Sequence, residues 1–483
     1  MQLKAILKII GLLLMLFSTT MLTPLLVDQI YQEGDSLPFL YGFALTFATG
    51  LVLWLPLRNY RKELRLRDGF IVVVLFWTVL GLAGAIPFVF TLQPYMSFTD
   101  AAFESISGLT TTGATVLTGL DDMPHAMLFY RQQLQWLGGM GIIVLAVALM
   151  PMLGIGGMSL YRAETPGPMK DTKLTPRLTE TAKALWYIYL SLTIACALAY
   201  WLGGMELFDA ISHSFATVSI GGFSPHDASI GYFNSPLIEM IAVVFMLLAG
   251  VNFALHFIAW RSFNLLTYWR DSEFKTYLLI LAIVSAITVV YLYLSDTYIY
   301  EWNALHHGLF QAVSIGTTTG FTTAEYHFWP GFLPVMLLFA SFVGGCAGST
   351  GGGMKVVRFL LLLKQGRREI LRLIHPTAVI PIRMGDKVLP TGVIESVWGF
   401  FAAYVGVFSV MLLVLMMTGL DQITAFSAVA ASLNNLGPGL GQVGANYASI
   451  PDTAKWVLSF GMIMGRLEIF TLLVILSPAF WRR

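Results

Sequence analysis

The sequence predicts an all-α polytopic membrane protein, in which two N-terminal transmembrane helices precede four repeated units of helix, re-entrant loop and helix. Three observations support this fold class. Of the 483 residues, 57% are hydrophobic and only 11% are charged, whereas a soluble globular chain carries about 25% charged residues. Ten apolar stretches are long enough to cross a bilayer, which takes about 20 helical residues. A short motif that ends in glycine recurs four times, roughly a hundred residues apart.

The predicted spans divide the chain into the leading helices and the four units. We expect spans at residues 5–28, 39–57, 70–91, 125–150, 183–203, 235–260, 276–295, 330–363, 392–418 and 455–479. The first span lacks the small-residue cleavage site of a removed signal peptide, so it is predicted to be a retained helix. The connections after the third, fifth, seventh and ninth spans hold the motifs. The predicted units are 1–68 for the leading helices, then 69–160, 161–270, 271–375 and 376–483.

Two copies of the motif are identical, and two weaker copies keep its register. The four copies are Thr110-Thr111-Thr112-Gly113, Ser219-Ile220-Gly221-Gly222, Thr317-Thr318-Thr319-Gly320 and Asn434-Asn435-Leu436-Gly437. One copy alone would be read as a surface turn. Four copies in register favour extended strands around one axis, because glycine permits the backbone angles of such a turn. Rings of carbonyl oxygens from these strands could replace the water shell of a dehydrated cation.

The residues before each glycine suit a short pore helix that enters the membrane and ends at its centre. Asp100 and Asp209 both stand thirteen residues before their glycines, where a carboxylate would meet the free N–H groups of a helix N-terminus. Glu104 and Gln311 share the position nine residues before. The negative end of each helix would then point toward the loop tips, which favours a cation path there.

The distribution of charge predicts how the chain is oriented. Lys and Arg gather in the connections around 58–67, 162–183, 261–275 and 364–387, whereas the connections with the motifs are nearly free of them. By the positive-inside rule both termini are cytoplasmic, and the four loops enter from the outside. Acids at that outer mouth would concentrate cations, and they are Glu33, Asp35, Asp121, Asp122, Asp227, Glu325 and Asp452.

A glycine-rich run interrupts the eighth predicted span and is a candidate gate. Regular helix is unfavourable there, since each interior glycine costs about 1 kcal/mol relative to alanine. We interpret the run as a mobile plug below the loops; the alternative is close helix packing through small residues. The residues assigned to the gate are Gly344, Gly345, Gly348, Ser349, Thr350, Gly351, Gly352 and Gly353, together with Arg466.

Arg466 and Glu468 fall inside the last predicted span, where charged residues usually face the protein interior or a water-filled path. Arg466 is interpreted as an electrostatic barrier below the loops, and the alternative is a structural ion pair with Glu468 or with an acid on a neighbouring helix. Arg131 lies near an outer helix end and is read as an interfacial anchor. His306 and His307 are read as a cap or packing pair at the start of the third pore helix.

These features together resemble the bacterial Trk/Ktr/HKT superfamily of potassium transporters, and the two extra N-terminal helices resemble its TrkH branch. The resemblance covers essentially the whole chain and rests on four runs: GLTTTGAT at 108–115, SIGGFS at 219–224, GCAGSTGGG at 345–353 and NNLGPG at 434–439. It implies that the chain is not an enzyme and takes up K+ across the bacterial cytoplasmic (inner) membrane. K+ is then the transported ion, with no bound organic cofactor.

The resemblance also implies a filter, an assembly and a regulator. K+ would bind the backbone carbonyls of the sixteen motif residues, in a pseudo-fourfold arrangement of membrane–pore–membrane units. A serine at the first filter glycine accompanies sodium transport in this superfamily, so Gly113 favours potassium. Members form homodimers, and TrkH-like members assemble with a cytoplasmic ring of nucleotide-binding TrkA-like subunits. Whether flux is passive or a symport coupled to H+ or Na+ is left open.

Two other classes compete with this interpretation. A secondary transporter of another small solute could be built on broken helices, although such folds typically show two repeats instead of four. An intramembrane serine hydrolase could use Ser349, but the sequence shows no motif for the histidine base that such chemistry requires.

Overall fold

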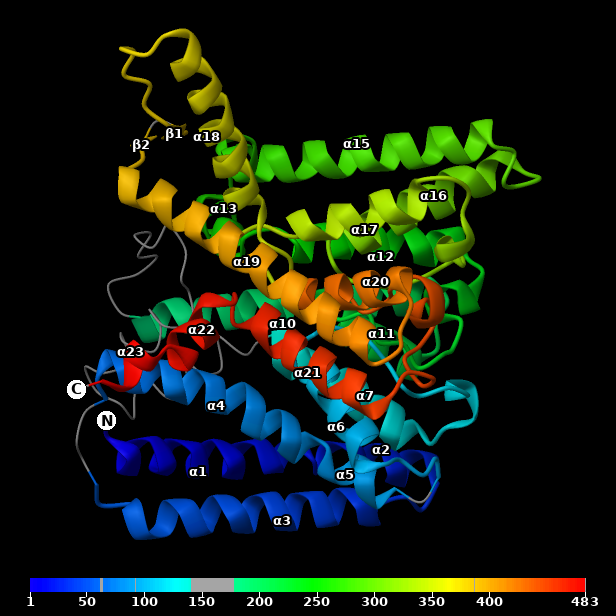
Figure 1. Cartoon of the computed structure of the whole chain (residues 1–483). Coiled ribbons are helices and arrows are strands. Elements are labelled where there is room, and N and C mark those ends of the chain that lie inside the picture. The colour runs from blue at the N-terminus through cyan, green and yellow to red at the C-terminus, as the bar shows by residue number, and fades with distance from the viewer. Residues whose placement is uncertain (61–63, 92, 140–177, 386, 483) are drawn as a thin grey trace.

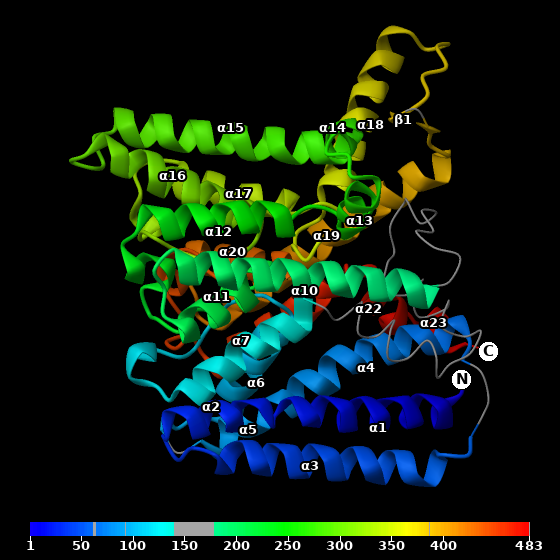
Figure 2. The ribbon, with the colours of Figure 1, turned by 180° about the vertical axis from the view of Figure 1, so that it is seen from behind.

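The computed structural model describes the whole chain except residues 61–63, 92, 140–177, 386 and 483. Most of its long helices run side by side in one direction, and the two termini lie at the same end of the bundle (Figure 1). Seen from behind, α10 and α15 follow the same direction as α1 and α3 (Figure 2). This arrangement is all-α and polytopic, as the sequence predicts; the described part of the chain adds only one two-residue strand pair.

The leading part consists of α1 (Leu3–Thr20), α2 (Thr23–Tyr31) and α3 (Leu37–Trp54), which continues into the 3-10 turn η1 (Leu55–Leu57). Small residues let α1 and α3 approach closely. A Cβ on Gly11 would lie 2.7 Å from the carbonyl oxygen of Gly50, and a Cβ on Gly50 would lie 2.6 Å from the carbonyl oxygen of Gly11. This glycine contact is typical of helix pairs in membranes, where association depends on close packing.

The first two units each place a pore helix between longer helices. The first unit contains α4 (Leu66–Gly84), α5 (Ile86–Phe90), the pore helix α6 (Phe98–Leu109), η2 (Leu120–Asp122) and α7 (His125–Gly139). The second contains α10 (Leu178–Leu202), the pore helix α11 (Leu207–Ser219), η4 (Ser229–Phe233), α12 (Pro236–Ala249) and α13 (Phe253–Ser262).

The third and fourth units repeat this plan with additions at the end that holds the termini. α14 (Leu266–Arg270) ends the second unit, and the third contains α15 (Ser272–Leu294), the pore helix α16 (Glu301–Gly316), η5 (Tyr326–Phe328), α17 (Leu333–Val343) and α18 (Val356–Ile374). Antiparallel strands β1 (Arg383–Met384) and β2 (Lys387–Val388) lead into the fourth unit. It contains α19 (Thr391–Met417), the pore helix α20 (Gln422–Asn434), η6 (Gly441–Val443), α21 (Asp452–Arg466), α22 (Phe470–Leu476) and α23 (Pro478–Trp481).

Two predicted spans are wrong as continuous helices. The span predicted at 235–260 is bent by 93° between α12 and α13, and the span predicted at 455–479 is bent by 113° between α21 and α22. The first break lies before Asn252, whose side chain caps α13 by accepting the N–H of Ala254. The second break contains two residues with positive φ, Glu468 and Ile469. Hydropathy does not register such short interruptions, since the residues around them remain apolar.

Two further predicted spans also differ from simple helices. The span predicted at 330–363 is divided, because α17 ends at Val343 and α18 begins at Val356. The α18 arm then leaves the direction of the bundle and projects beyond it (Figures 1 and 2). The span predicted at 125–150 corresponds to α7, and its remainder lies outside the described residues. Among the described residues, six helices are long and apolar enough to cross a membrane, or eight with the two bent pairs.

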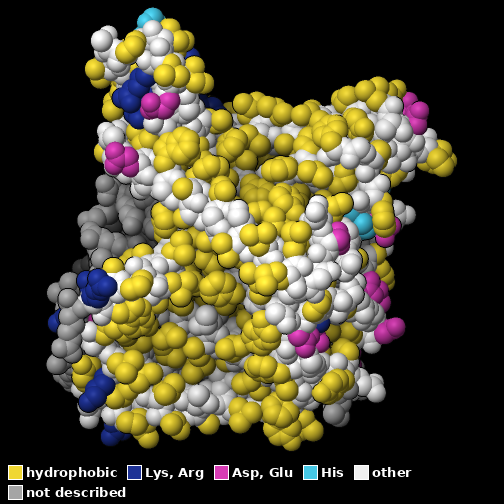
Figure 3. Space-filling view, in the orientation of Figure 1, with side chains coloured by type: hydrophobic (Ala, Val, Ile, Leu, Met, Phe, Trp, Pro, Cys, Tyr) yellow, Lys and Arg dark blue, Asp and Glu magenta, His cyan; other side chains and the backbone are white. Residues whose placement is uncertain are grey.

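The surface separates by charge along the bundle. In the space-filling view, most visible Lys and Arg side chains lie toward the end with the termini and on the α18 arm, and most visible acids lie toward the opposite end (Figure 3). A broad hydrophobic band lies between them. This pattern is typical of a protein whose middle contacts lipid.

Candidate functional site: a ring of four glycine-ended loops

The four pore helices end in the same hydrogen-bonded turn. In each motif the residue before the final glycine donates its N–H to the carbonyl five residues earlier, and all four bonds measure 2.8 Å. The donor–acceptor pairs are Thr112 to Ser107, Gly221 to Ala216, Thr319 to Ser314 and Leu436 to Ala431. Two identical motifs and two different ones therefore adopt one backbone geometry, as the register of the motifs predicts.

In each loop two residues of the motif, separated by one, adopt positive φ. The second residue before the glycine has positive φ in every copy: 55° at Thr111, 55° at Ile220, 70° at Thr318 and 52° at Asn435. The final glycines have φ values of 81°, 80°, 86° and 92° in chain order. A residue other than glycine adopts such angles at a cost of about 1–3 kcal/mol and is held there by its surroundings. The strained conformation is thus maintained four times, which points to a functional requirement.

The four loops close into a ring. A Cβ added to Gly113 would lie 2.1 Å from the carbonyl oxygen of Gly221, and the remaining units repeat this contact in order. The glycine of each unit faces the carbonyl before the glycine of the next, and the fourth faces the first: Gly222 to Thr319 at 2.1 Å, Gly320 to Leu436 at 2.1 Å and Gly437 to Thr112 at 2.7 Å. Backbone oxygens from all four units therefore surround one axis, and there is no room for a side chain at any of the four glycines.

Side chains of the pore helices brace the strands that leave the ring. Glu104 accepts hydrogen bonds from the Thr115 hydroxyl at 2.9 Å and the Val116 N–H at 3.0 Å. The residues nine before the glycine in the next two units make equivalent contacts, His213 to Ser224 at 3.0 Å and Gln311 to the Ala324 carbonyl at 2.8 Å. In the fourth unit Ser427 donates to the Leu440 carbonyl at 3.1 Å and accepts from its N–H at 2.8 Å.

Arg131 belongs to this bracing layer, so its interpretation as an interfacial anchor is wrong. Its side chain is 1% exposed and pairs with Glu104 at 2.8 Å. It also donates to the Ser224 carbonyl at 3.0 Å and lies over the ring of Phe223, 4.3 Å from the centroid. A buried charge of this kind requires a partner. The pair therefore joins the exits of the first two loops, a role that the position of Arg131 near a predicted helix end could not indicate.

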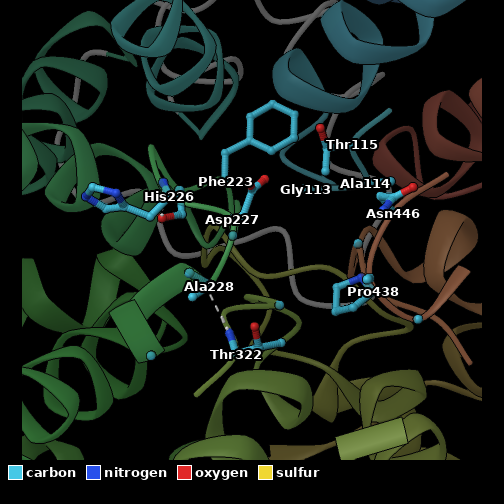
Figure 4. A pocket seen from close by; sticks show the side chains of 18 of the residues that line it. Gly113, Ala114, Thr115, Phe223, His226, Asp227, Ala228, Thr322, Pro438 and Asn446 are labelled. Atoms are coloured by element: carbon cyan, nitrogen blue, oxygen red, sulfur yellow. Dashed lines mark hydrogen bonds between the residues drawn. The ribbon is translucent and has the colours of Figure 1, made fainter. Parts of the chain in front are cut away.

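A cavity of about 480 Å³ opens above the ring, on the side of the acid-rich connections. Figure 4 shows Gly113, Phe223, Thr322 and Pro438, one from each unit, around this cavity. His226 lies at its edge and contacts Asp121 at 2.6 Å. Burial alone would lower the pKa of His226, but hydrogen bonds and charges from Asp209 and Asp121 outweigh burial and raise this pKa above its ordinary value. The His226 imidazole links the outer connections of the first two units through Asp121 of the first and Asp209 of the second.

The glycine-rich segment lies directly against the opposite side of the ring. Gly352 donates its N–H to the Thr318 hydroxyl at 2.7 Å, and Gly353 donates to the Asn434 carbonyl at 3.0 Å. The Thr350 hydroxyl donates to the Val218 carbonyl at 2.9 Å. One segment from the third unit thus contacts loop residues of the third and fourth units and the residue before the second motif.

Arg466 ends α21 beneath the ring. Its guanidinium donates to the Thr111 hydroxyl at 3.1 Å, the Thr350 carbonyl at 3.3 Å and the Gly138 carbonyl at 2.7 Å. The alternative partner Glu468 forms its described ion pair with Arg358 of α18. Arg466 thus connects the first motif to the glycine-rich segment, and its role as an electrostatic barrier stays a prediction.

Glu273 is a site residue that the sequence analysis missed. From the first turn of α15 its carboxylate accepts the N–H of Ala347 at 2.7 Å and the N–H of Val357 at 3.2 Å. Ala347 is the fourth residue of the glycine-rich segment, and Val357 lies in the first turn of α18, just after the segment. No pattern in the sequence links residue 273 to residues 347 and 357, although an acid at the start of an apolar span is a signal worth testing. Lys355, another buried residue, closes the segment internally by donating to the Gly351 carbonyl.

Ser349 shows no sign of a nucleophile. Its hydroxyl donates to the Cys346 carbonyl at 2.7 Å and accepts from the Gly351 N–H at 3.3 Å. The described contacts of this hydroxyl are therefore backbone atoms of its own segment, which does not favour the hydrolase alternative.

Comparison with known proteins identifies relatives along the full length of the chain. Residues 36–483 match the model of the TrkH family, described as cation transport protein. The chain is 58% identical to the Trk system potassium uptake protein TrkH of Vibrio parahaemolyticus and 55% identical to that of Escherichia coli K12, each over 100% of both chains. It also matches the crystal structure of the potassium transporter TrkH from Vibrio parahaemolyticus, with a TM-score of 0.91, 56% identity and 100% coverage of both chains. A ring built from four repeated loops and a match of this extent lead to one conclusion: the chain belongs to the TrkH family of cation transport proteins.

Proposed function

We propose that this protein takes up K+ across the bacterial cytoplasmic membrane, with the sixteen motif residues as its selectivity filter. The observation that carries the proposal is the closed ring, in which each glycine faces a backbone carbonyl of the next unit. Carbonyl rings replace the hydration shell of a permeating cation. The relatives named as potassium uptake proteins support the choice of ion.

Selectivity for K+ over Na+ follows from the lack of space at the glycines. A side chain at any of them would displace a carbonyl of the neighbouring unit, and all four positions are glycine. The acids around the outer mouth raise the local cation concentration before the ring is reached. Ion selection therefore depends on the backbone, and the different side chains of the second and fourth motifs can be tolerated.

The glycine-rich segment and Arg466 form the gate in this proposal. The segment contacts the ring directly, and Arg466 adds a fixed positive charge beneath it. Two unit charges 4 Å apart repel by about 4 kcal/mol at an effective dielectric of 20. A fraction of this energy slows cations severalfold, because 1.4 kcal/mol corresponds to a factor of ten. Opening would require the segment to leave the ring and the charge to move or be screened.

We further propose a homodimer with both termini in the cytoplasm, regulated by a ring of nucleotide-binding TrkA-like subunits. The orientation rests on the Lys and Arg residues that gather in the connections on the side of the termini. The dimer and the regulatory ring rest on the family resemblance. The α18 arm, which extends from the bundle on the side of the termini, is a suitable element to transmit a signal from such a ring to the segment that precedes it (Figure 1).

Uptake of 86Rb+ into proteoliposomes tests the proposed function. The purified protein should admit 86Rb+, and excess K+ should compete far better than excess Na+. Setting the membrane potential and the pH gradient independently distinguishes passive flux from coupling to protons, and varying external Na+ tests coupling to sodium. The proposal is contradicted if the protein shows no 86Rb+ uptake when its regulatory TrkA-like subunits are present to open it. It is also contradicted if Na+ and K+ compete equally.

A further inference from the structure

A cluster of potential metal ligands lies outside the ring, between the second and third units. Glu239 in the first turn of α12 faces His306 and His307 of α16, and one ligand atom from each of the three residues lies within 4.8 Å of the others. Glu239 is 2% exposed and His306 is 7% exposed, so two of the three are buried. The sequence reading of a cap or packing pair concerned the two histidines alone and could not include Glu239, which is 67 residues from His306.

The cluster contains more than one ion pair, because both histidines face the same carboxylate. The Nδ1 atom of His306 is 2.7 Å from the Glu239 carboxylate, which already gives this carboxylate a partner. The Nδ1 atom of His307 is 4.0 Å from the same carboxylate oxygen, and the two imidazole centroids are 4.0 Å apart. Adjacent helical side chains normally diverge by about 100°. Here both imidazoles turn toward one carboxylate, so three ligating groups converge on one point.

We propose that Glu239, His306 and His307 bind a divalent first-row transition metal ion such as Zn2+. Two imidazoles and one carboxylate are a ligand set that zinc accepts, with water in the fourth position. Zinc binds such ligands at about 2.0–2.2 Å. The ion would therefore replace the short bond between His306 and Glu239, and its binding would release the proton held there.

The surroundings show which part of the chain a bound ion would affect. His307 also contacts the Thr323 hydroxyl at 3.0 Å, and Thr323 follows Gly320 in the strand that leaves the third loop. The cluster is thus beside the outer mouth, on the side of the acid-rich connections. A bound ion would join α12 of the second unit to α16 of the third, and it would hold the strand above the filter in place.

A second histidine near the outer mouth provides a contrast. His226 also has two acidic neighbours, Asp121 at 2.6 Å and Asp209 at 3.2 Å. These carboxylates lie on opposite ring nitrogens, Nδ1 and Nε2. A single ion cannot take all three as ligands. The convergence at Glu239, rather than the mere presence of histidine and acid, therefore distinguishes the proposed site.

Zinc titration of the full-length protein without a polyhistidine tag tests this proposal. In lipid nanodiscs, calorimetry should show one saturable Zn2+ site per chain, and Zn2+ should raise the unfolding temperature. His307→Gln retains the bond between Glu239 and His306, and it should weaken Zn2+ binding at least tenfold. His375→Gln, which removes an exposed histidine at the end of α18, is the matched control and should bind Zn2+ like the unmodified protein.

Cobalt gives a readout that does not depend on any variant folding. Co2+ in the same site should produce the visible absorption bands of four- or five-coordinate cobalt, and Zn2+ should displace them. The proposal is overturned if the unmodified protein shows neither these bands nor saturable Zn2+ binding, or if folded His307→Gln binds Zn2+ as tightly as the unmodified protein. If His307→Gln does not fold, Glu239→Gln replaces it with the same expectation. None of these results depends on K+ uptake, so this inference and the proposed function can fail separately.

Discussion

The ring and the region beneath it are built in opposite ways. In the ring all four units contribute the same turn, the same 2.8 Å hydrogen bond and a glycine that faces a neighbouring carbonyl. Beneath it, the third unit alone supplies the glycine-rich segment and the fourth alone supplies Arg466. A ring of ligands requires equal contributions, because one displaced carbonyl alters the whole ring. A gate needs only one obstruction. The comparison therefore predicts that selectivity and gating can be changed independently.

The largest effect on ion flux is expected at Gly113, where the symmetry of the ring would be broken. In Gly113→Ser the new Cβ would lie 2.1 Å from the Gly221 carbonyl oxygen, with φ at 81°. Backbone strain of this kind costs about 1–3 kcal/mol, which corresponds to a roughly 5–150-fold loss of the native ring conformation. We expect K+ flux to fall by such a factor, or Na+ to compete with 86Rb+ in proteoliposomes.

Gly119→Ser is a control that introduces backbone strain from positive φ without a clash against a neighbouring carbonyl. Gly119 has a similar φ of 72°, but nothing lies within 4 Å of its Cβ position. This control should therefore retain K+ selectivity even if it loses some stability. Unchanged preference for K+ over Na+ in Gly113→Ser would contradict the assignment of the filter.

The second effect concerns the braces behind the ring, where Glu104 of the first unit corresponds to Gln311 of the third. Glu104→Gln makes the two units alike but leaves Arg131 buried without its carboxylate. Removing one partner of a buried pair typically costs about 3–5 kcal/mol. We expect a large fall in unfolding temperature, measured by fluorescence-detected gel filtration of heated samples.

A double-mutant cycle tests whether the pair causes that loss. Glu104→Gln combined with Arg131→Gln removes both charges, so it should recover part of the stability that either single variant loses. If the losses of the two single variants simply add, the ion pair is not what holds the first loop.

The part of the fold that repeats could be predicted from the sequence, because each copy carries its own turn. Thr111 and Asn435 have almost the same φ although their motifs share only the final glycine. The run of glycines also predicted the break between α17 and α18, but the bends after α12 and α21 were not predictable in this way. The bends after α12 and α21 occupy three residues each within apolar surroundings, so the spans at 235–260 and 455–479 were expected to be straight.

The candidate site shows the same limit. Arg466 was recognisable, because an arginine within an apolar stretch is costly and therefore conspicuous. Glu273 and the pairing of Arg131 with Glu104 were not, since their partners are 74 and 27 residues away and nothing local marks them. Local backbone requirements are present in the sequence, whereas contacts between distant side chains depend on the folded structure.

The third prediction concerns Arg466, in the region beneath the ring that only single units supply. Arg466→Ala removes the positive charge beneath the ring, so K+ flux per assembled protein should rise severalfold. The K+ over Na+ preference should stay unchanged, because the ring is intact. Arg466→Lys keeps the charge but loses the planar fork that contacts Thr111, Thr350 and Gly138, and it should remain closer to the original flux. An unstable Arg466→Ala with normal flux per surviving molecule would remove Arg466 from the mechanism.

The smallest effect is expected at Glu273, which joins the glycine-rich segment at Ala347 to the start of α18 at Val357. In Glu273→Gln a neutral amide replaces the carboxylate that accepts the N–H groups of Ala347 and Val357. Hydrogen bonds to charged groups contribute about 1.5–3 kcal/mol, against about 0.5–1.5 kcal/mol for neutral ones. A difference of about 1 kcal/mol makes the released segment about fivefold more populated. In the protein measured without its regulatory subunits, basal 86Rb+ flux should therefore rise about fivefold. Competition by Na+ should be unchanged.

Two further variants serve as the negative and the positive control for the Glu273→Gln measurement. Glu301→Gln changes an exposed acid in the first turn of α16 and should leave basal flux unaltered. Deletion of residues 351–353 removes the part of the segment that contacts the ring and should raise basal flux more than Glu273→Gln does. If the deletion variant inserts and folds but conducts like the unmodified protein, the glycine-rich segment is a packing element and does not gate the ion path. If only Glu273→Gln fails to raise flux, the segment still gates, and its contacts with the ring hold it in place without the hydrogen bonds to Glu273.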